Sequence, residues 1–488
     1  MVNYVTGKGR FMFDTTLVPE VIFDERPDFV KLYYKAWEQA AAHIKTVPGL
    51  PVERYMDEAC MPGRLWIWDT CFMVHFCKYS PDFFPGIQSL DNFYMPMYDH
   101  APSPCKIHHM DNPPLFAWIE YEYYRFTGDK SRIYRNLVEK CYLQKHFEFL
   151  EKECRFGYDS PLTGSIAMWQ KFDAGYAWAG CPSGMDNTPR SRGNYHTILW
   201  VDALAQMALS AKYIAKLARE INETAIAAEY EQKYEEKSAL LNKYYFDETD
   251  GCYYDIGIKF HEFCKVLTPA SFWVLLAEAA TRERAARQIS TILDPNLLGG
   301  MVPLPTVARN DRNFTADGCY WNGSVWLPTT YMTAKALEKY GEFDLASDIA
   351  YLTVNHMVKT YENFLPHTIW ECYSPTAFEP ARNKKGKYVR KDFCGWSALG
   401  PISLFIENII GLYRADAVAG KVKFHPRKNS SLRYGVRNFK FGNISCDIIV
   451  ENGLLYCRSD APFILETDSA SYQIPCGEAT IKLQPIKE

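Results

Sequence analysis

The sequence predicts an all-α chain in which helical hairpins form an (α/α)6 toroid, a six-hairpin barrel, with a small C-terminal β appendage. Three observations support this fold class. Apolar residues recur at helical spacing through most of the chain, the helices follow one another as hairpins, and long loops separate alternate hairpins. A plain helix bundle would not need loops of this length.

Each predicted helix has an apolar face or recognisable end signals. The first covers 28–44, where seven apolar residues share one face. Prolines open and a glycine closes the helix from Pro113 to Gly128, and Thr268 with Pro269 opens a helix over SFWVLLAEAATRE. The other helices are expected near residues 69 and 90 and at about 129–153, 194–220, 224–245, 325–340, 343–361 and 396–413.

The chain changes character at its two ends. After about Ala419 the apolar residues alternate as they do in strands, with a hairpin turn at Glu451-Asn452-Gly453. We therefore predict an N-terminal extension over 1–25 that adds a strand or two, a barrel over 26–418, and a β-rich appendage over 419–488. Function is expected in the long loops of the barrel, which are rich in glycine, proline and aromatic residues.

Composition excludes several classes of partner. The formal net charge is −4, the sequence pI is about 6.3 and no polybasic run occurs, so we expect neither nucleic acid nor a membrane as partner. The N-terminus lacks the pattern of a secretory signal. Fifteen cysteines are scattered without CxxC spacing, which favours reduced, mostly buried thiols and a cytoplasmic location.

Aromatic residues make up 15% of the chain, and many lie beside polar residues in segments that contain glycine or proline. A large core accounts for part of this content. Sugar-binding sites also use aromatic rings, because the C–H face of a pyranose packs on them. The pattern favours a small carbohydrate as partner.

Two segments combine a carboxylate with such rings. PGRLWIWDTCF places Arg64, Trp66, Trp68 and Asp69 around a turn into a helix. The alternative for Asp69 is the commoner role of a helix cap. In PHTIWECYSP, Glu371 lies among Trp370 and other aromatic residues, an environment that suits acid or base work, although a buried structural glutamate is the alternative.

Two further segments complete the set of candidates. Asp186 lies in the glycine- and proline-broken loop CPSGMDNTPR, where an Asx-turn is the commoner role. In DGCYWNGSVW, Tyr320 and Trp321 precede a helix and are candidates for a stacking wall. No HExxH or comparable spacing occurs around the histidines, so no metal is expected, and no dinucleotide or phosphate motif indicates a cofactor.

Taken in order, the four segments resemble those of α/α-barrel glycosidases, the clan that includes trehalases and glycoside hydrolase family 63. The likeness is greatest to the mannosylglycerate/glucosylglycerate hydrolase-like branch of family 63. SGMDNTPR matches the loop that carries the general acid, which implies that role for Asp186. WECYSP followed by FCGWSALG resembles the end piece that carries the general base, which implies Glu371 for the base and Trp396 for the site wall.

The resemblance implies an inverting hydrolase of α-glycosidic bonds, α-glucosidase-like, with Asp69 and Arg64 holding hydroxyls of the sugar. The chain departs from the family pattern at Asn322, which replaces an arginine, at Ser324, which replaces a proline, and in the basic insertion RNKKGKYVRKDF before Trp396. The substitutions and the insertion both bear on which substrate the protein accepts. The alternatives are a glycoside phosphorylase, a sugar epimerase, and a carbohydrate-binding protein without activity.

Overall fold

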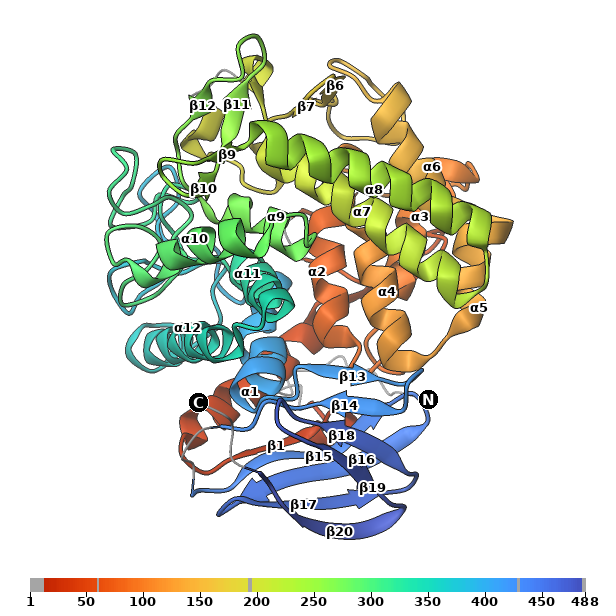
Figure 1. Ribbon diagram of the computed structural model, residues 1–488, viewed down its shortest axis with the longest axis vertical. Coiled ribbons are helices and arrows are strands. Elements are labelled where there is room, and N and C mark those ends of the chain that lie inside the picture. The colour runs from red at the N-terminus through yellow and green to blue at the C-terminus, as the bar shows by residue number, and fades with distance from the viewer. Residues whose placement is uncertain (1–12, 59–60, 192–194, 428–430, 485–488) are drawn as a thin grey trace.

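The structure, a computed structural model, describes residues 13–58, 61–191, 195–427 and 431–484. Helices form the larger part of the molecule, and the C-terminal strands gather at one end of it (Figure 1). The N-terminal strand β1 (Glu20–Phe23) lies among those C-terminal strands, so segments from both ends of the chain share one sheet.

Within the described residues, a set of buried helical segments contact one another in a closed cycle. They are α2 (Ile67–Cys77), α4 (Phe116–Thr127), α7 (Val201–Glu220), α9 (Trp273–Leu276), α11 (Leu327–Tyr340), and the 3-10 helix η9 (Trp396–Leu399) continued by the π-helix η10 (Gly400–Ile409). Each contacts the next in this order, and η9 contacts α2 to close the cycle. Every residue of α2 and η10 is buried, as an inner position requires.

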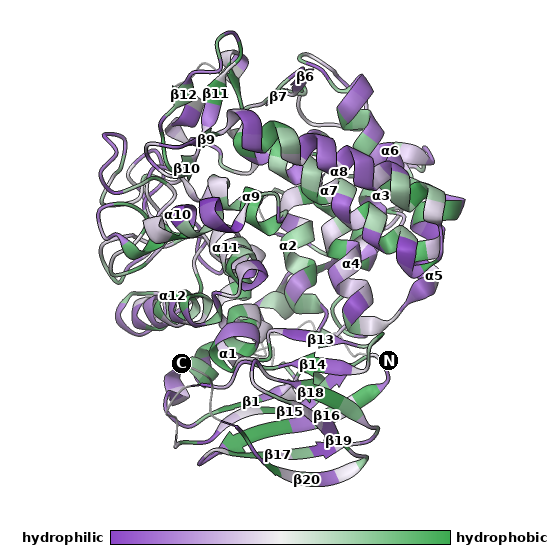
Figure 2. Cartoon of the chain, in the orientation of Figure 1, coloured by the Kyte–Doolittle hydropathy of each residue, from purple (hydrophilic) through white to green (hydrophobic). Residues whose placement is uncertain are grey.

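A second set of helices alternates with these inner segments along the chain. They are α1 (Pro27–Ala42), α3 (Asp91–Tyr98), α5 (Lys130–Tyr134), α6 (Tyr142–Glu148), α8 (Thr224–Tyr244), α10 (Arg282–Leu293) and α12 (Phe343–Asn363). In Figure 1, α7 and α8 lie side by side as a hairpin. Figure 2 shows many hydrophilic residues along α8, which is consistent with an outer position.

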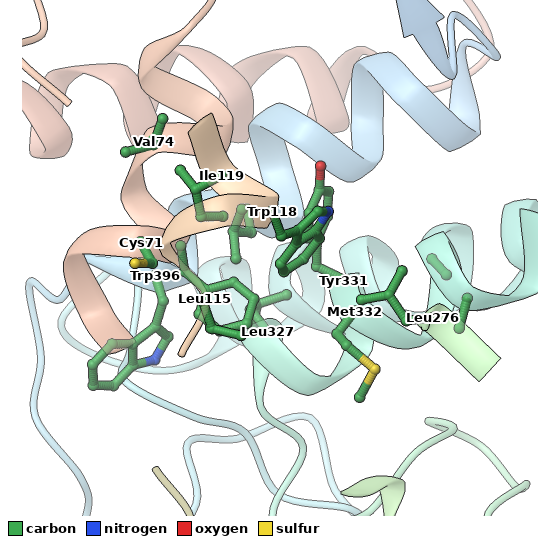
Figure 3. Close-up of a cluster of buried hydrophobic side chains, with 14 of the residues drawn as sticks. Cys71, Val74, Leu115, Trp118, Ile119, Leu276, Leu327, Tyr331, Met332 and Trp396 are labelled. Carbon is green, nitrogen blue, oxygen red and sulfur yellow. The ribbon is translucent and has the colours of Figure 1, made fainter. Parts of the chain in front are cut away.

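Aromatic and aliphatic side chains of the inner segments fill the centre of the cycle. Figure 3 shows Trp118 of α4 beside Tyr331 of α11, with Cys71 of α2 and Trp396 of η9 in the same cluster. Trp118 also meets Trp273 edge to face, with 5.9 Å between ring centroids. Burial of these large rings makes the centre a rigid base beneath the loops that enter the inner segments.

The C-terminal region consists of two sheets, so the all-α label needs correction. One sheet has the order β1-β15-β16-β17-β20 and the other β13-β14-β18-β19. The helix-rich body with a C-terminal β region is confirmed, and an α+β description fits it better than all-α. The C-terminal strands are β13 (Arg414–Asp416), β14 (Lys421–Lys423), β15 (Tyr434–Phe441), β16 (Ile444–Glu451), β17 (Leu454–Ser459), β18 (Phe463–Glu466), β19 (Ser471–Ile474) and β20 (Gly477–Lys482).

Short strands lie within the loops between the helices. β8 pairs with β11, which also pairs with β12, while β4 pairs with β5 and β6 with β7. These ladders order long connections that contain little other regular structure. The bounds are β2 (Ile44–Thr46), β3 (Arg54–Met56), β4 (Arg64–Leu65), β5 (Lys106–Ile107), β6 (Gln170–Phe172), β7 (Gly175–Ala177), β8 (Ile198–Leu199), β9 (Phe246–Asp247), β10 (Cys252–Tyr253), β11 (Asp255–Gly257) and β12 (Phe263–Cys264).

Most predicted helices are confirmed to within a few residues, but the helix over SFWVLLAEAATRE is wrong. The chain leaves the helical conformation after Leu276, and Glu278 adopts φ +55°. Thr281 then caps a separate helix, α10, because its side chain accepts a hydrogen bond from the Arg284 N–H. The predicted cap at Thr268 is confirmed, since its hydroxyl accepts from the Ala270 N–H.

The expectation of reduced, mostly buried cysteines is met in the described part of the chain. Fourteen cysteines there are free thiols, most of them buried. No described helix is both long enough and apolar enough to cross a bilayer.

Candidate active site

A cavity of about 370 Å³ lies where the chain enters the inner helical segments at their N-terminal ends. The segments before α2, α4, α7, α11 and η9 all contribute to its wall, which brings together residues distant in sequence. The cavity is lined by Glu58, Met61, Trp66, Trp68, Asp69, His108, His109, Asn112, Cys181, Gly184, Asp186, Tyr320, Trp321, Trp326, Arg390 and Trp396.

Most of the candidate residues from the sequence meet at this cavity. Those that line it are Trp66, Trp68, Asp69, Asp186, Tyr320, Trp321 and Trp396. The other three do not line it. Glu371 contacts two lining residues, Arg64 donates a hydrogen bond to the lining residue His108, and Trp370 packs instead on Phe364 and Tyr388.

The Asp186 loop is fixed from two sides. On one side, the Asn187 amide donates to the Cys319 carbonyl at 2.9 Å and accepts from the Trp321 N–H at 2.8 Å. On the other, Arg190 forms buried ion pairs with Asp202 of α7 and Asp255 of β11, at 2.7 and 2.6 Å. The DNTPR sequence thus joins the loop to three other parts of the chain.

Burial changes the acidity of Asp186. Its side chain borders the cavity and is partly exposed there, yet desolvation raises its pKa to about 6, with the Glu371 carboxylate adding to the rise and Lys384 opposing it. A carboxyl with this pKa holds a proton well above the ordinary range for aspartate. Asp186 is therefore suited to donate a proton near neutral pH.

The carboxyl group of Glu371 is surrounded by hydrogen-bond donors. Its Oε1 atom accepts from the Tyr320 hydroxyl at 2.8 Å and from the Arg390 guanidinium at 2.5 Å. Its Oε2 atom accepts from the Arg390 backbone N–H at 3.2 Å. These contacts give Glu371 an ion pair with Arg390 and two further hydrogen-bond donors. Glu371 is only 2% exposed, so these contacts act in a largely desolvated setting.

The backbone next to this carboxylate is held in an unusual conformation. Cys319 and Tyr320 have positive φ values, +33° and +66°, which non-glycine residues rarely adopt. This conformation accompanies the contact of the Tyr320 hydroxyl with Glu371. The Trp396 indole N–H donates to the Glu371 carbonyl at 3.2 Å, which fixes the same segment from another side.

Tryptophan rings form much of the cavity wall. Trp321 and Trp326 stack with 4.0 Å between centroids, and Trp396 lies 5.7 Å from Trp326. Gly184, at φ +82°, allows the Asp186 loop to lie against the Trp68 ring, where an added Cβ would come within 2.7 Å of it. This wall provides flat apolar faces of the kind on which sugar rings stack.

A second pair of carboxyls lies in the same cavity. Desolvation raises the pKa of Asp69 well above its usual value, and the neighbouring Glu58 carboxylate raises it further. Both side chains line the cavity. The oxygens of a carboxyl group accept hydrogen bonds from sugar hydroxyls, and the binding role of Asp69 stays a prediction.

Sequence reasoning missed several of the lining residues. Glu58 and Arg390 have no motif of their own, and Arg390 lies in the basic insertion RNKKGKYVRKDF, which the sequence related only to substrate identity. His108 and His109 were noted only for lacking a metal-ligand spacing. A search for charged residues within the loops that flank the motifs would have found Arg390.

A family model described as "Mannosylglycerate hydrolase MGH1-like glycoside hydrolase domain" matches residues 100–388. The chain belongs to this family. The matched range includes Asp186, Tyr320 and Glu371. The predicted resemblance to family 63 glycoside hydrolases is therefore confirmed.

Individual relatives agree with this assignment. An uncharacterized protein of Borreliella burgdorferi is 27% identical over 420 residues, which are 81% of this chain and 82% of that protein. A periplasmic trehalase of Escherichia coli is 26% identical over 183 residues, or 36% of this chain. That match covers only 30% of the trehalase.

Solved structures share the fold. A family 63 mannosylglycerate hydrolase from Thermus thermophilus superposes with a TM-score of 0.57 at 17% identity, covering 76% of this chain and 99% of that one. A chain named sialidase superposes with a TM-score of 0.69 at 14% identity, covering 95% of this chain but 40% of that one. At these identities the likeness concerns the fold alone.

Proposed function

We propose that the protein is an inverting glycoside hydrolase that cleaves α-glycosidic bonds, with Asp186 as general acid and Glu371 as general base. The observation that carries the proposal is the contrast between one carboxyl that lines the cavity and another that contacts two of its lining residues. Asp186 has a pKa of about 6, whereas Glu371 forms an ion pair with Arg390 and accepts a hydrogen bond from Tyr320. A carboxyl that keeps its proton to near-neutral pH suits the acid, which leaves the arginine-paired carboxyl as the base.

In the proposed reaction, Asp186 gives its proton to the glycosidic oxygen as the bond to the anomeric carbon breaks. The departing group leaves as a neutral alcohol, and positive charge develops on the sugar ring. Water attacks the opposite face of the anomeric carbon and loses a proton to Glu371. Inversion requires the two carboxyls to lie roughly 6.5–9.5 Å apart, which leaves room for that water.

The contacts of Glu371 indicate which oxygen receives the proton. Each carboxylate oxygen has two lone pairs. Among the described residues, Oε1 accepts from both Tyr320 and Arg390, while Oε2 accepts only from the Arg390 backbone. Oε2 therefore keeps a lone pair for the attacking water, and we assign the base function to that atom.

The proposed sugar subsite uses the rest of the cavity. Asp69 accepts hydrogen bonds from sugar hydroxyls, Arg64 assists through its contact with His108, and Trp66, Trp68, Tyr320, Trp321 and Trp396 wall the pocket. α-Glucosides are the first substrates to test, followed by α-mannosides. Trp370 packs away from this wall and contributes through the backbone segment next to Glu371.

We also propose that the closed cycle of inner segments is the inner ring of an (α/α)6 toroid. The alternation of inner and outer helices along the chain supports this. The division into 1–25, 26–418 and 419–488 is kept as part of the proposal; β1 falls in the N-terminal extension, and β13 falls on the helical side of the second boundary.

The first-formed anomer tests the proposed reaction. Aryl α-glucosides and α-mannosides are incubated with the protein in an NMR tube, and the anomeric signals are followed before mutarotation. Inversion predicts that the β-anomer appears first, with no change when inorganic phosphate is added. Release of the α-anomer would contradict inversion, and formation of a sugar phosphate would identify a phosphorylase.

A further inference from the structure

Three residues with metal-binding side chains meet in the cavity wall, apart from the two carboxyls of the proposed reaction. His108 and His109 precede α4, and Cys181 precedes α7. One donor atom from each lies within 4.8 Å of the others. All three residues line the cavity.

The closest pair already has the spacing of two ligands on one ion. His109 Nε2 lies 3.3 Å from Cys181 Sγ. Tetrahedral zinc with bonds of about 2.0 Å to nitrogen and 2.3 Å to sulfur separates such atoms by about 3.5 Å. A small adjustment of the side chains thus places an ion between them.

The other ring nitrogen of His109 is held in the way that metal-binding histidines require. Nδ1 lies 2.9 Å from the Ser165 hydroxyl and 3.9 Å from Asp111 Oδ1. Asp111 is fully buried, and its Oδ1 atom has no hydrogen-bond partner among the described residues. A carboxylate behind a histidine is the usual outer partner of a metal site. Here Asp111 lies behind the ring, and the contact of Ser165 with Nδ1 leaves Nε2 beside the thiol.

We propose that His108, His109 and Cys181 form a binding site for a soft divalent cation such as Zn²⁺, with the fourth position open to the cavity. Binding replaces the proton of the Cys181 thiol, so one proton is released for each ion bound and a thiolate–metal bond forms. Two nitrogen ligands and one sulfur ligand favour zinc or cobalt over magnesium or calcium. The bound ion would share the cavity with a sugar.

Arg64 opposes this site. Its guanidinium donates to His108 Nδ1 at 2.9 Å, so the neutral ring must carry its proton on Nε2, and neither nitrogen is free. Binding through His108 requires Arg64 to leave. Arg64→Met should therefore tighten the binding of the ion, and a weakened affinity in this variant would contradict the assigned ligand set.

Cobalt provides a direct readout on the intact 488-residue chain. Metal-free protein is titrated with Co²⁺ while the thiolate-to-cobalt charge-transfer band is recorded in the near ultraviolet. We expect one equivalent of Co²⁺ to bind per chain, Zn²⁺ to displace it, and proton release to accompany binding. Absence of the band in folded wild-type protein would overturn the proposal.

Matched variants locate the ligands. Cys181→Ser should abolish the band and His109→Gln should weaken binding at least tenfold, with circular dichroism showing that both variants fold. Cys476→Ser is the control, since Cys476 is the other exposed thiol of the described chain and lies in the β region. An unchanged band in Cys181→Ser would place the ion elsewhere. None of these readouts depends on glycosidase activity.

Discussion

At the scale of single residues, burial sets the pKa of the proposed acid Asp186, and nearby charged residues adjust it. Desolvation is the main cause of the raised pKa of Asp186, and Lys384 is the leading opposing influence. Lys384 is exposed and belongs to the basic insertion. One physical effect of that departure from the family pattern is therefore to oppose the rise in the pKa of Asp186. The insertion thus affects the proposed acid through Lys384 and contacts the proposed base through Arg390.

The pH dependence of activity should reflect the pKa of Asp186. The general acid must be protonated, so kcat/KM is expected to fall as the pH rises through about 6, the pKa of Asp186. Lys384→Met removes a positive charge that lowers this pKa, so the alkaline limb should move to higher pH. Lys385→Met, a neighbouring exposed lysine, serves as control, and a limb that moves to lower pH in Lys384→Met would contradict the account.

The candidate site was predictable from the sequence only where motifs carry it. Glu371 was favoured by its aromatic neighbours, while Asp186 alone read as a turn residue and became the acid through the resemblance. The structure adds a local reason for Asp186, namely burial. The contact of Arg390 with Glu371 was not predictable, because it depends on how a loop folds back on its own chain. The roles of both carboxyls stay predictions.

At the scale of elements, a buried charge network holds the acid-bearing loop. Arg190 and its partners Asp202 and Asp255 are each at most 2% exposed in their side chains. Removing the arginine leaves two buried carboxylates without a counter-ion. Arg190→Met should lower the free energy of unfolding by about 3–5 kcal/mol, as measured by urea denaturation.

A surface ion pair provides the comparison. Arg219 pairs with Glu231, and both side chains are substantially exposed. Arg219→Met should change stability by less than about 1 kcal/mol. Equal effects of the two substitutions would mean that the Arg190 network does not hold the loop in the way described.

Helices were predictable where one apolar face and clear end signals coincide. In α1, six residues of the predicted face are buried: Phe29, Leu32, Tyr33, Ala36, Trp37 and Ala40. Helix α10 was missed because apolar residues continue through the break after Leu276, which hides the new start. The capping threonine Thr281 was the available signal.

At the scale of the whole molecule, the β region covers the ends of inner helices opposite the cavity. Phe439 of β15 packs on Tyr79, just after α2, and on Phe126 of α4, with ring centroids 6.0 and 5.9 Å apart. Arg125 of α4 pairs with Asp416 of β13. These contacts couple the sheets to the helices.

Phe439→Ala tests this coupling. Loss of a buried ring should lower the free energy of unfolding by about 3–5 kcal/mol, and calorimetry should show one transition moved to lower temperature. Phe260→Ala is the control, because Phe260 is 85% exposed. A new low-temperature transition for the β region, with the helical transition unmoved, would show that the two parts are uncoupled.

The overall class was predictable because helical periodicity dominates the sequence, and the two sheets were underestimated. Alternation in the tail predicted strands, but pairing of β1 with β15 joins residues more than 400 positions apart and leaves no local trace. The cytoplasmic location and the three-part division stay predictions.

The central claim is that Asp186 acts as the general acid and Glu371 as the general base. The most direct test is how the loss of kcat/KM in each variant depends on the leaving group. kcat/KM is measured for α-glycosides with a dinitrophenyl or a sugar leaving group, in wild type, Asp186→Asn and Glu371→Gln. Asp186→Asn should slow the sugar substrate by about 10²–10⁴-fold and the dinitrophenyl substrate far less, because the latter needs no proton. Glu371→Gln should slow both substrates alike. Equal losses for both substrates in Asp186→Asn would contradict its role as the acid.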